Sequence, residues 1–448
     1  MTIGEWGALL RSRKLSCVEL VQQTLAQMKA VEGLNMTITV TAEQALAEAA
    51  LRDEELAKGI DRGPLHGIPT AYKDIFYTRG VRTTGGSLLY ADFVPDHNAT
   101  VVDRLANAGA ICVGKANLHE LAYGATSKNP HYGSVRNPCN PGHIAGGSSG
   151  GSAALIAADC VPFTLGTDTG GSIRIPASYC GVFGLKPTYG RVSRHGVLPL
   201  AFSLDHVGPL ASCAEDIGLV MNVIAGHDAK DASSGDRPFP QFSPIRMSDL
   251  KGLRVGIPRS FYFQRIHDEV AAAVGNAVSD LRKNGAAILD VDIPDMEEAN
   301  TAARIIQFGE ATSLYAHHQN ANLFGEDVWA LIQQGRLIQA HEYVNAQRIR
   351  TLFRRDFDRL WTQVDAVIAP TTPISAPKLS DTTVAFGNER EDVRIASTRL
   401  CRAINFLGEP SLSIPCGKDK AGLPIGMQII GPLFAEARLL QIASSLER

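Results

Sequence analysis

Three segments of the sequence combine amine, hydroxyl and glycine groups in patterns that could support covalent catalysis. GPLHGIPTAYKD (63–74) places Lys73 near the end of an apolar strand, and IAGGSSGGSAALIAA (144–158) crowds two serines with glycines ahead of a helix. TLGTDTGGSIRIPASYCG (164–181) places Ser172 after a strand and two glycines, where a short helix is expected to begin. A serine beside free backbone N–H groups supplies a nucleophile and an oxyanion hole, which are the parts that acyl transfer needs.

Each segment also has an ordinary interpretation when it is taken alone. Lys73 could be an edge lysine that reaches water, and Ser172 could be a helix N-cap. The 144–158 stretch could be a linker, although an apolar helix follows it at once, and it lacks the G-x-x-x-x-G-K-[ST] pattern of a phosphate loop. Gly146 to Gly150 matches the G-x-S-x-G nucleophile elbow, but NPCNPGH (137–143) precedes it and cannot be a central strand.

Together the three segments resemble the amidase signature family from about Gly63 to Pro209. The serines follow Lys73 at the family's intervals, since 148 minus 73 is 75 and 172 minus 148 is 24. The matching motifs are KD (73–74), GGSSGGS (146–152), GTDTGGSIR (166–174), GLKPTYGRVS (184–193) and SLDHVGP (203–209), with weaker matches in VGKANLHELA (113–122), IAPTTP (368–373) and GLPIGMQIIGP (422–432).

The resemblance implies a role for each matching residue. Ser172 is expected to be the nucleophile, Ser148 the proton relay after a cis peptide bond from Gly147, and Lys73 the base. The backbone N–H groups expected to form the oxyanion hole are those of Thr169, Gly170, Gly171 and Ser172. The supporting residues are expected to be Gly147, Ser149, Asp168 and Arg174, with Asp168 and Arg174 as candidates for a structural ion pair.

The base role makes a physical demand on Lys73. A lysine accepts a proton only when it is neutral, so its pKa must fall, which burial achieves. We therefore expect Lys73 to be buried among hydroxyls and backbone carbonyls, with no close carboxylate, because strand alternation sends Asp74 to the opposite face. Three histidines near the motifs, His119, His195 and His206, are expected to be structural or to line the rim of the site. Cys180 is expected to be a buried core thiol.

The composition excludes several classes of protein. A net charge of -3 provides no basic excess for binding nucleic acid directly. The sequence has no run of 18 or more apolar residues, so we expect no transmembrane helix. The N-terminus has no uninterrupted apolar segment, so we expect no secretory signal. The eight cysteines are scattered singly and no H-E-x-x-H occurs, so we expect a reduced, cytoplasmic protein with no metal or cofactor. A homodimer is the default expectation.

The elements that position these residues follow from periodicity and turn signals. Residues 1–59 predict helices, with Ser16 as a cap and a second helix over 43–58. Strands are predicted over 68–76, 111–116, 161–168, 364–373, 411–416 and 424–431, helices over 98–110, 214–226, 298–362 and from about 434, a β-α-β unit over 253–293 and a surface loop over 228–244.

The fold expected is α/β. One large domain over 1–448 has a central mixed, largely parallel twisted sheet with helices on both faces, which is the amidase signature fold. Residues 63–209 form its signature core, and residues 230–380 its variable, mostly helical region.

Three functions fit the resemblance. The first is a hydrolase that releases ammonia or an amine from a small carboxamide or ureido-type substrate through a seryl acyl-enzyme. The second is the amidase subunit of a glutamine-dependent aminoacyl-tRNA amidotransferase, in which a partner binds the tRNA; the apolar Ile175 offers no anchor for an amino-acid zwitterion and favours the first. The third is an inactive homologue that serves as a scaffold. Candidate substrate-binding residues are Tyr123 and Thr126, followed by Phe308, Tyr315, Phe324 and Trp329.

Overall fold

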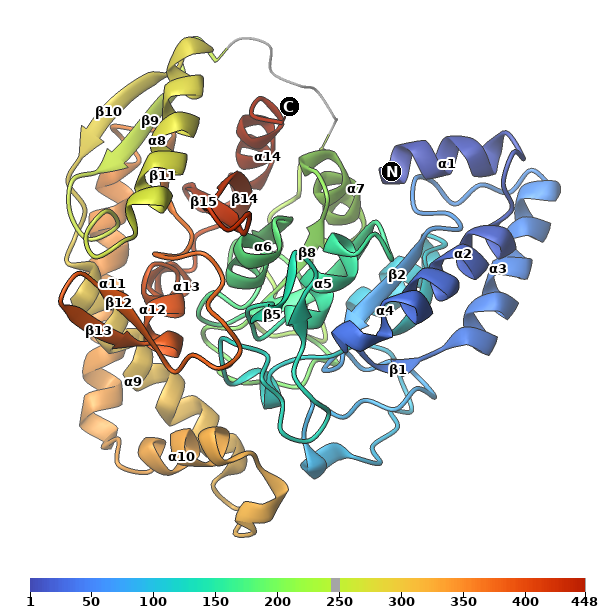
Figure 1. Cartoon of the computed structure of the whole chain (residues 1–448), viewed down its shortest axis with the longest axis horizontal. Coiled ribbons are helices and arrows are strands. Elements are labelled where there is room, and N and C mark those ends of the chain that lie inside the picture. Colours follow the sequence, from blue (N-terminus) through green and yellow to red (C-terminus); the bar gives the residue numbers. More distant parts are fainter. Residues whose placement is uncertain (243–249, 448) are drawn as a thin grey trace.

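The chain is built around one mixed sheet that runs through the middle of the molecule (Figure 1). The structure is a computed structural model, and it describes residues 1–242 and 250–447. In order across the sheet, its strands are β1 (Thr37–Val40), β3 (Ile111–Ala116), β2 (Pro69–Lys73), β6 (Phe163–Asp168), β8 (His206–Ala211), β7 (Phe183–Lys186), β14 (Ser411–Lys418), β15 (Pro424–Ile430), β11 (Ala366–Pro370), β9 (Arg254–Pro258) and β10 (Ala287–Val291).

The strand directions confirm the prediction of a mixed sheet. β3, β2 and β6 are parallel, as are β11, β9 and β10 near the other edge. The strands between these two blocks pair antiparallel. Two short hairpins lie outside the sheet, β4 (Arg136–Asn137) with β5 (Asn140–Ile144) and β12 (Thr383–Phe386) with β13 (Glu389–Asp392).

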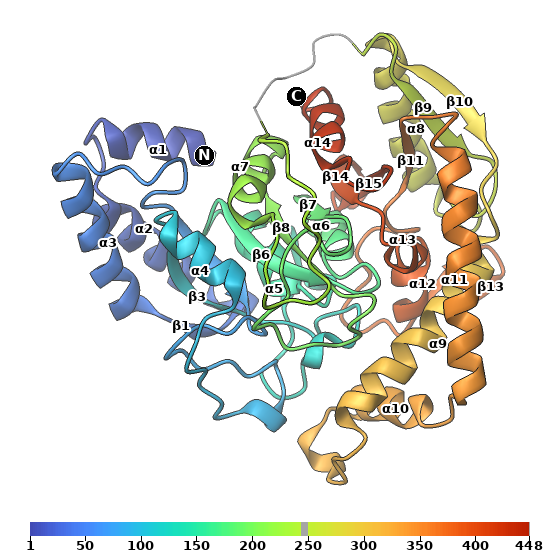
Figure 2. The same ribbon diagram turned by 180° about the vertical axis from the view of Figure 1, so that it is seen from behind.

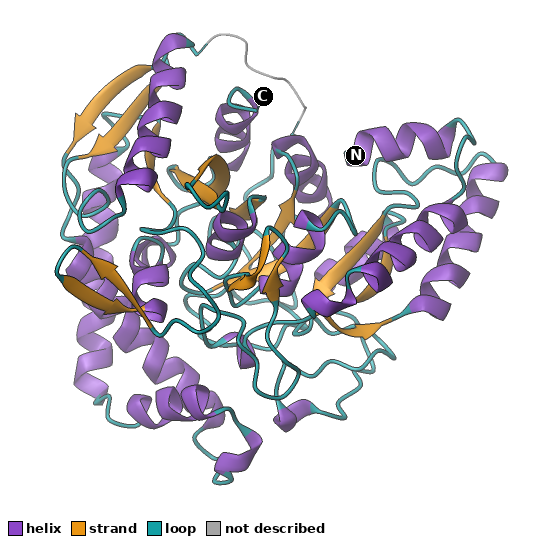
Figure 3. Cartoon of the chain, viewed as in Figure 1, coloured by secondary structure: helices purple, strands orange, loops and turns teal. Residues whose placement is uncertain are grey.

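Helices cover both faces of the sheet (Figure 3). α5 and α6 pack on each other and on the sheet, while α7, α8 and α14 pack on its other side. The helices are α1 (Ile3–Arg11), α2 (Cys17–Ala30), α3 (Ala42–Ala57), α4 (Thr100–Asn107), α5 (Gly150–Ala157), α6 (Arg174–Cys180), α7 (Ala214–Ile224), α8 (Asp268–Lys283), α9 (Met296–Tyr315), α10 (Glu326–Gly335), α11 (Ala340–Leu360), α12 (Val393–Arg399), α13 (Arg402–Leu407) and α14 (Glu436–Ser444).

The N-terminal region corrects one prediction. Ser16 caps α2 in a capping box with Glu19, as predicted. However, residues 1–59 are not all helical, because Thr37–Val40 form the edge strand β1, which pairs antiparallel with β3. A four-residue segment carries too little periodicity to identify, and its strand conformation depends on the neighbouring strand supplying its hydrogen bonds.

The middle of the chain follows the predictions more closely. The β-α-β unit is β9, α8 and β10, and the helical stretch is α9, α10 and α11, which extend away from the sheet at the end of the molecule opposite α1 (Figure 2). Residues 228–242 contain no helix or strand, and the rest of the predicted loop, 243–244, lies outside the described residues. A search of the described residues finds no helix with the length and hydropathy to cross a membrane.

Candidate active site

The candidate residues gather where β2 and β6 end. Because these two strands are parallel neighbours, with Tyr72 opposite Leu165, their carboxyl ends lie at the same edge of the sheet. Lys73 is the last residue of β2, and the turn that carries Ser172 leaves the end of β6. Ser148 lies just before α5, which packs on β6 and on β2. Ends of parallel strands are where α/β proteins commonly place ligand sites.

Lys73 is completely buried and surrounded by hydroxyl groups. Its Nζ donates to Oγ of Ser148 at 2.7 Å and to Oγ1 of Thr167 at 2.8 Å. Burial lowers the pKa of Lys73 from its usual 10.5 to about 7, against the smaller opposing influence of the Asp168 and Asp205 carboxylates. A substantial fraction of the amine is therefore neutral near pH 7, which a proton acceptor requires.

Asp74 is kept away from Lys73, as strand alternation predicts. Its carboxylate accepts hydrogen bonds from the backbone N–H and the hydroxyl of Thr84, at 2.8 and 2.5 Å, and lies 3.2 Å from Nζ of Lys115. The carboxylate nearest in sequence to Lys73 therefore neutralises another lysine.

The turn that carries Ser148 is hydrogen bonded to β6 and to the turn that carries Ser172. The peptide bond between Gly147 and Ser148 is cis, as the resemblance implied. Ser149 donates from Oγ to the carbonyl of Thr167 at 3.1 Å, and its N–H donates to the carbonyl of Ser172 at 3.1 Å. The backbone of the two serine-bearing turns is thus directly connected.

Ser172 lies at the boundary between the core and a cavity. The residue is 8% exposed and lines a cavity of about 290 Å³. In the part of the chain that the structure describes, no hydrogen bond joins its hydroxyl to that of Ser148. Catalytic hydrogen bonds often tighten only when substrate binds, so this separation is compatible with a relay.

The turn that carries Ser172 differs from the expected oxyanion hole at Gly171. The N–H of Gly171 donates to Oδ1 of Asp168 at 2.7 Å and is therefore already used. Asp168 also accepts from the N–H of Ile173 at 3.1 Å, because its carboxylate organises the entry to α6. The free N–H groups among the four expected are those of Thr169, Gly170 and Ser172, which donate to no described group.

Asp168 and Arg174 form the buried ion pair that was anticipated. Arg174 Nε lies 3.0 Å from Asp168 Oδ2, and both side chains are fully buried. Burial acts to raise the pKa of Asp168, but the Arg174 guanidinium outweighs it and holds this pKa well below its usual range. Arg174 also donates to the side chains of Asn405 and Gln428, so the pair attaches the turn to α13 and β15.

The cavity at Ser172 includes only some of the predicted substrate-binding residues. Tyr123 and Phe308 line it, whereas Thr126 is hydrogen bonded behind the wall to His119. Tyr315 and Phe324 pack together in the core, and Trp329 packs against Phe324, because aromatic residues at helical spacing more often serve packing. The remaining lining includes charged and amide side chains that the sequence did not identify: Arg304, Gln307, Asp327, Gln334, Arg394 and Arg402.

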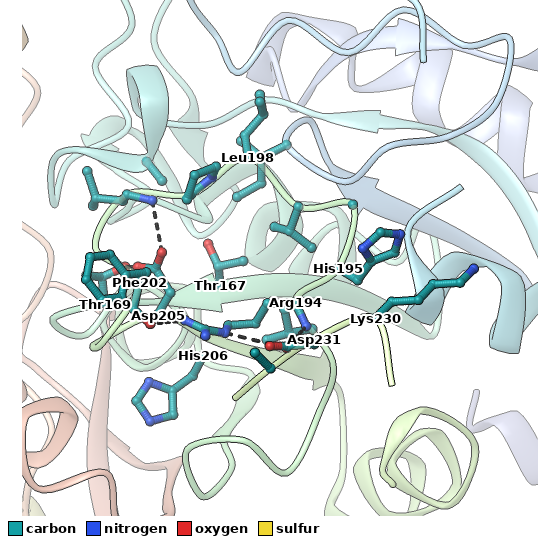
Figure 4. Close-up of a pocket in the computed structure, with 18 residues that line it drawn as sticks. Thr167, Thr169, Arg194, His195, Leu198, Phe202, Asp205, His206, Lys230 and Asp231 are labelled. Atoms are coloured by element: carbon teal, nitrogen blue, oxygen red, sulfur yellow. Dashed lines mark hydrogen bonds and ion pairs between the residues drawn. The ribbon is translucent and has the colours of Figure 1, made fainter. Parts of the chain in front are cut away.

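A second cavity, of about 320 Å³, is lined by Thr167, Thr169 and Asp205 among other residues (Figure 4). It shares Ala122, Thr169 and Leu200 with the first cavity and reaches Thr167, which accepts a hydrogen bond from Lys73. Asp205 binds two of the residues that the cavities share. Its carboxylate accepts hydrogen bonds from Oγ1 of Thr169 at 2.6 Å and from the N–H of Leu200 at 2.9 Å. Sequence analysis missed both Thr167 and Asp205, although each lies inside a quoted motif, GTDTGGSIR or SLDHVGP.

The histidines and the thiol take other positions. His119 lies 3.0 Å from a carboxylate oxygen of Asp327, and His195 and His206 line the second cavity. Burial lowers the pKa of His206 well below its usual value. Cys180 is buried, and its thiol faces the carbonyl of Ala145. Over residues 1–242 and 250–447, no group of three or more His, Cys, Asp or Glu side chains could hold a metal ion.

Comparison with known proteins extends over the whole chain. The family model described as Amidase matches residues 19–440. A glutamyl-tRNA(Gln) amidotransferase subunit from Methylococcus capsulatus (Bath) is 41% identical over 471 residues, which is 99% of this chain and 95% of that protein.

Two solved structures agree closely in fold. The first is described as a vestigial protein complex that reveals the evolutionary origins of an s-triazine catabolic enzyme. It is 36% identical, with a TM-score of 0.96 over 100% of this chain and 98% of the other. The second is described as an amidase and is 32% identical, with a TM-score of 0.91 over 100% of this chain and 99% of the other.

Proposed function

This chain belongs to the amidase family, whose members cleave amide bonds, and we propose that it does so through an acyl-enzyme formed on Ser172. The observation that carries this proposal is the environment of Lys73. This buried lysine has a pKa of about 7, no carboxylate partner among the described residues and a 2.7 Å hydrogen bond to a serine hydroxyl, which suits it to proton transfer.

In the proposed reaction, protons move from Ser172 through Ser148 to Lys73 and then return by the same route. Neutral Lys73 takes the proton of Ser148, Ser148 takes that of Ser172, and Ser172 Oγ bonds to the amide carbon. The developing oxyanion accepts hydrogen bonds from the N–H groups of Thr169, Gly170 and Ser172. When the carbon–nitrogen bond breaks, Ser148 gives a proton to the leaving nitrogen and regains one from Lys73. Water then attacks the acyl-enzyme and gives a proton to Ser148, whose own proton passes to Lys73. When the bond between the acyl carbon and Ser172 Oγ breaks, Ser148 protonates that oxygen, Lys73 returns its proton to Ser148, and the acid is released.

Active-site labelling tests this assignment before the substrate is known. An uncharged fluorophosphonate is expected to modify the purified chain at one site, Ser172, and Ser172→Ala is expected to abolish both labelling and amide cleavage, by about 10⁴-fold or more. A chain that resists the reagent would be the inactive scaffold. Full amidase activity in Ser172→Ala would disprove the mechanism.

This chemistry fits two settings, a hydrolase of small amides that acts alone and the amidase subunit of a glutamine-dependent amidotransferase. The name and 41% identity of the relative favour the second setting over the stand-alone hydrolase that the sequence analysis placed first. Ile175, which supported the hydrolase, is buried beneath the turn. The net charge of -3 leaves binding of tRNA to a partner in this second setting.

Assays of the single chain distinguish the settings. A stand-alone hydrolase is expected to turn over simple and aryl amides without a partner and to form no stable complex. An amidotransferase subunit is expected to release ammonia from glutamine and to co-purify with other subunits when it is isolated from its native cells. A panel of glutamine, asparagine, simple amides and ureido compounds, with ammonia as the readout, decides between them.

A further inference from the structure

Asp205 is a carboxylate beside the turn that carries Ser172, and the proposed reaction gives it no part. It directly precedes β8, whose antiparallel pairing with β6 places His206 opposite Asp168. The next position along each chain brings Asp205 to Thr169, and Oγ1 of Thr169 donates to Oδ1 of Asp205 at 2.6 Å (Figure 4). A hydrogen bond thus joins this carboxylate to the residue with which the turn begins.

The hydrogen bond from Thr169 to Asp205 uses the side chain of the threonine and not its backbone. The backbone N–H of Thr169 donates to no described group, and the residue lines the cavity at Ser172. At Gly171 the situation is the opposite, since Asp168 accepts a hydrogen bond from the N–H itself. Asp205 therefore fixes Thr169 while its N–H stays available to an oxyanion, which is the preorganisation that an oxyanion hole requires.

The surroundings of Asp205 suit the charged form of its carboxyl group. Besides the bond from Thr169, it accepts hydrogen bonds from the N–H of Leu200 at 2.9 Å and from the N–H of Ala201 at 3.1 and 3.0 Å. Burial raises the pKa of Asp205, and the bonds from Thr169 and Leu200 oppose that rise. Every hydrogen bond at this group within the described chain is donated to it, so a carboxyl proton would find no acceptor there. A length of 2.6 Å is also typical of a hydroxyl that donates to a charged oxygen.

The charge of Asp205 also acts on Lys73. Two carboxylates favour the protonated form of Lys73 without contact, Asp168 and then Asp205. Asp168 is balanced by Arg174 at 3.0 Å. Asp205 forms no ion pair within residues 1–242 and 250–447, so its negative charge can stabilise Lys73 when the amine takes up a proton.

Four further titratable or charged groups lie around Asp205, and none of them bonds to it among the described residues. Each is held by another partner: Arg194 lies 3.7 Å from Asp231, His206 contacts the carbonyl of Leu204 at 2.6 Å, Glu310 accepts from the N–H of Ser203 at 2.9 Å, and Tyr315 donates to the carbonyl of Pro199 at 3.2 Å. The pH dependence of Ser172 labelling is therefore expected to report Lys73 and the influence of Asp205 on it.

We propose that Asp205 is a positioning residue of the reaction, which holds the N–H of Thr169 toward the oxyanion and stabilises the ammonium that Lys73 becomes when it receives the proton of Ser148. The inference rests on the proposed function of Ser172 and adds a residue that acts through two of its groups. Asp205 touches neither the substrate nor the reacting atoms, so its effect must appear in the rate and in the pH dependence of Ser172.

Asp205→Asn tests both effects through labelling of Ser172 by an uncharged fluorophosphonate across a range of pH. The limiting rate at high pH is expected to fall by about 100-fold, because an oxyanion donor loses its orientation. The pH midpoint is expected to move below that of the native chain, because the charge that favours protonated Lys73 is removed. Asp53→Asn is the matched control. Asp53 is also a partly buried carboxylate that accepts backbone N–H groups, those of Cys17 and Val18, but it lies on α3, and both quantities are expected to stay at their native values.

Variants of Thr169 separate orientation from charge. Thr169→Val removes the hydroxyl and keeps the carboxylate, so the limiting rate is expected to fall about tenfold with the pH midpoint unmoved. Thr169→Ser restores the hydroxyl and is expected to recover most of that loss. Because Asp205 orients the oxyanion donor through Thr169, the double variant Asp205→Asn with Thr169→Val is expected to be no slower than Asp205→Asn alone.

The outcomes distinguish this inference from a structural role and from the proposed function. A midpoint that does not move in folded Asp205→Asn, or losses that multiply in the double variant, would show that Asp205 only supports the fold. If Asp205→Asn does not fold, equal rates in Thr169→Val and Thr169→Ser would still overturn the inference. In either case the acyl-enzyme stands as long as native Ser172 is labelled. If native Ser172 does not react, the proposed function fails, and the inference falls with it.

Discussion

Two fully buried lysines on neighbouring strands of the same sheet have opposite surroundings. Lys73 ends β2, and Lys115 lies on β3 opposite Tyr72. Lys115 has a carboxylate, Asp74, at 3.2 Å and also donates to the carbonyl of Phe76 and the hydroxyl of Thr83. Within residues 1–242 and 250–447, Lys73 bonds only to the hydroxyls of Ser148 and Thr167.

The comparison shows that the surroundings of a buried lysine determine its pKa and therefore the role to which it is suited. Burial lowers the pKa of both lysines, but Asp74 opposes this effect at Lys115, whereas at Lys73 the influence of carboxylates is weak and its pKa falls to about 7. Asp74 follows Lys73 in the chain and yet pairs with Lys115, because consecutive strand residues point to opposite faces. Lys115 is therefore suited to hold structure, and Lys73 to exchange a proton.

The largest expected effect separates the two lysines by activity. Lys73→Met removes the base while roughly keeping the volume, so labelling of Ser172 and amide cleavage at pH 7 are expected to fall by about 10³-fold. Lys115→Met, assayed where it remains folded, is expected to keep the chemistry of each folded molecule. Equal losses in the two folded variants would break the distinction.

The second prediction reverses the order for stability. Lys115→Met leaves the Asp74 carboxylate buried without its cation and is expected to lower the free energy of unfolding by about 3 kcal/mol. Lys73→Met exchanges a group of low pKa for an apolar one of similar size and is expected to change it by less than about 1.5 kcal/mol. Urea unfolding measures both, and Lys115→Met combined with Asp74→Asn should recover part of the loss.

The pH dependence of the reaction sharpens the role of Lys73. Because its pKa is about 7, the rate of Ser172 labelling is expected to rise through pH 7 and to fall about tenfold for each unit below it. A midpoint near the usual 10.5 of lysine would contradict the assignment of Lys73 as base.

The same shift has a consequence for stability with a definite sign. Between pH 7 and 10.5 the unfolded chain holds a proton on Lys73 that the folded chain has released, so the contribution of Lys73 to stability increases with pH over that range. Below pH 7 the full penalty of burying the charge is present. The difference in unfolding free energy between native protein and Lys73→Met, measured across this range, isolates the effect.

The smallest effect concerns the second hydroxyl at Lys73. Thr167→Val removes an acceptor that favours the protonated amine, so the pH midpoint of labelling is expected to move below that of the native chain, with a loss of about fivefold in rate. Thr164→Val is the matched control, because this hydroxyl on the same strand donates to the carbonyl of Ser152 and not to the lysine network. An equal shift of the pH midpoint in Thr164→Val would contradict a specific effect of the Thr167 hydroxyl on the pKa of Lys73.

Much of the candidate site was accessible from residue patterns alone. The motifs predicted roles for Lys73, Ser148 and Ser172, whose turns and strand the structure brings together, and alternation along the strand placed Asp74 away from the lysine. The ion pair of Asp168 with Arg174 was also anticipated, since its members stand six residues apart in one motif. A sequence motif is informative at such places because the turn and the strand end that carry these residues are formed by residues adjacent in the chain.

Long-range packing determined the rest. The N–H of Gly171 was counted for the oxyanion, but the folded turn directs it to Asp168. Arg304 and Arg402 lie on α9 and α13, far from the motifs in sequence, and reach the Ser172 cavity only because α9 packs on α13 beside the nucleophile turn. No periodicity in either helix marks an arginine that lines a cavity.

The chemistry proposed for this protein was thus predictable from its sequence, because the proposed nucleophile, relay and base lie in motifs at a strand end and in two turns. The pKa of the base and the charge of the pocket were not, because both depend on what surrounds a side chain after folding. Among the described residues, no carboxylate bonds to Lys73 and no group bonds to Nε of Arg402. Such absences belong to the packed structure and not to any segment of the chain.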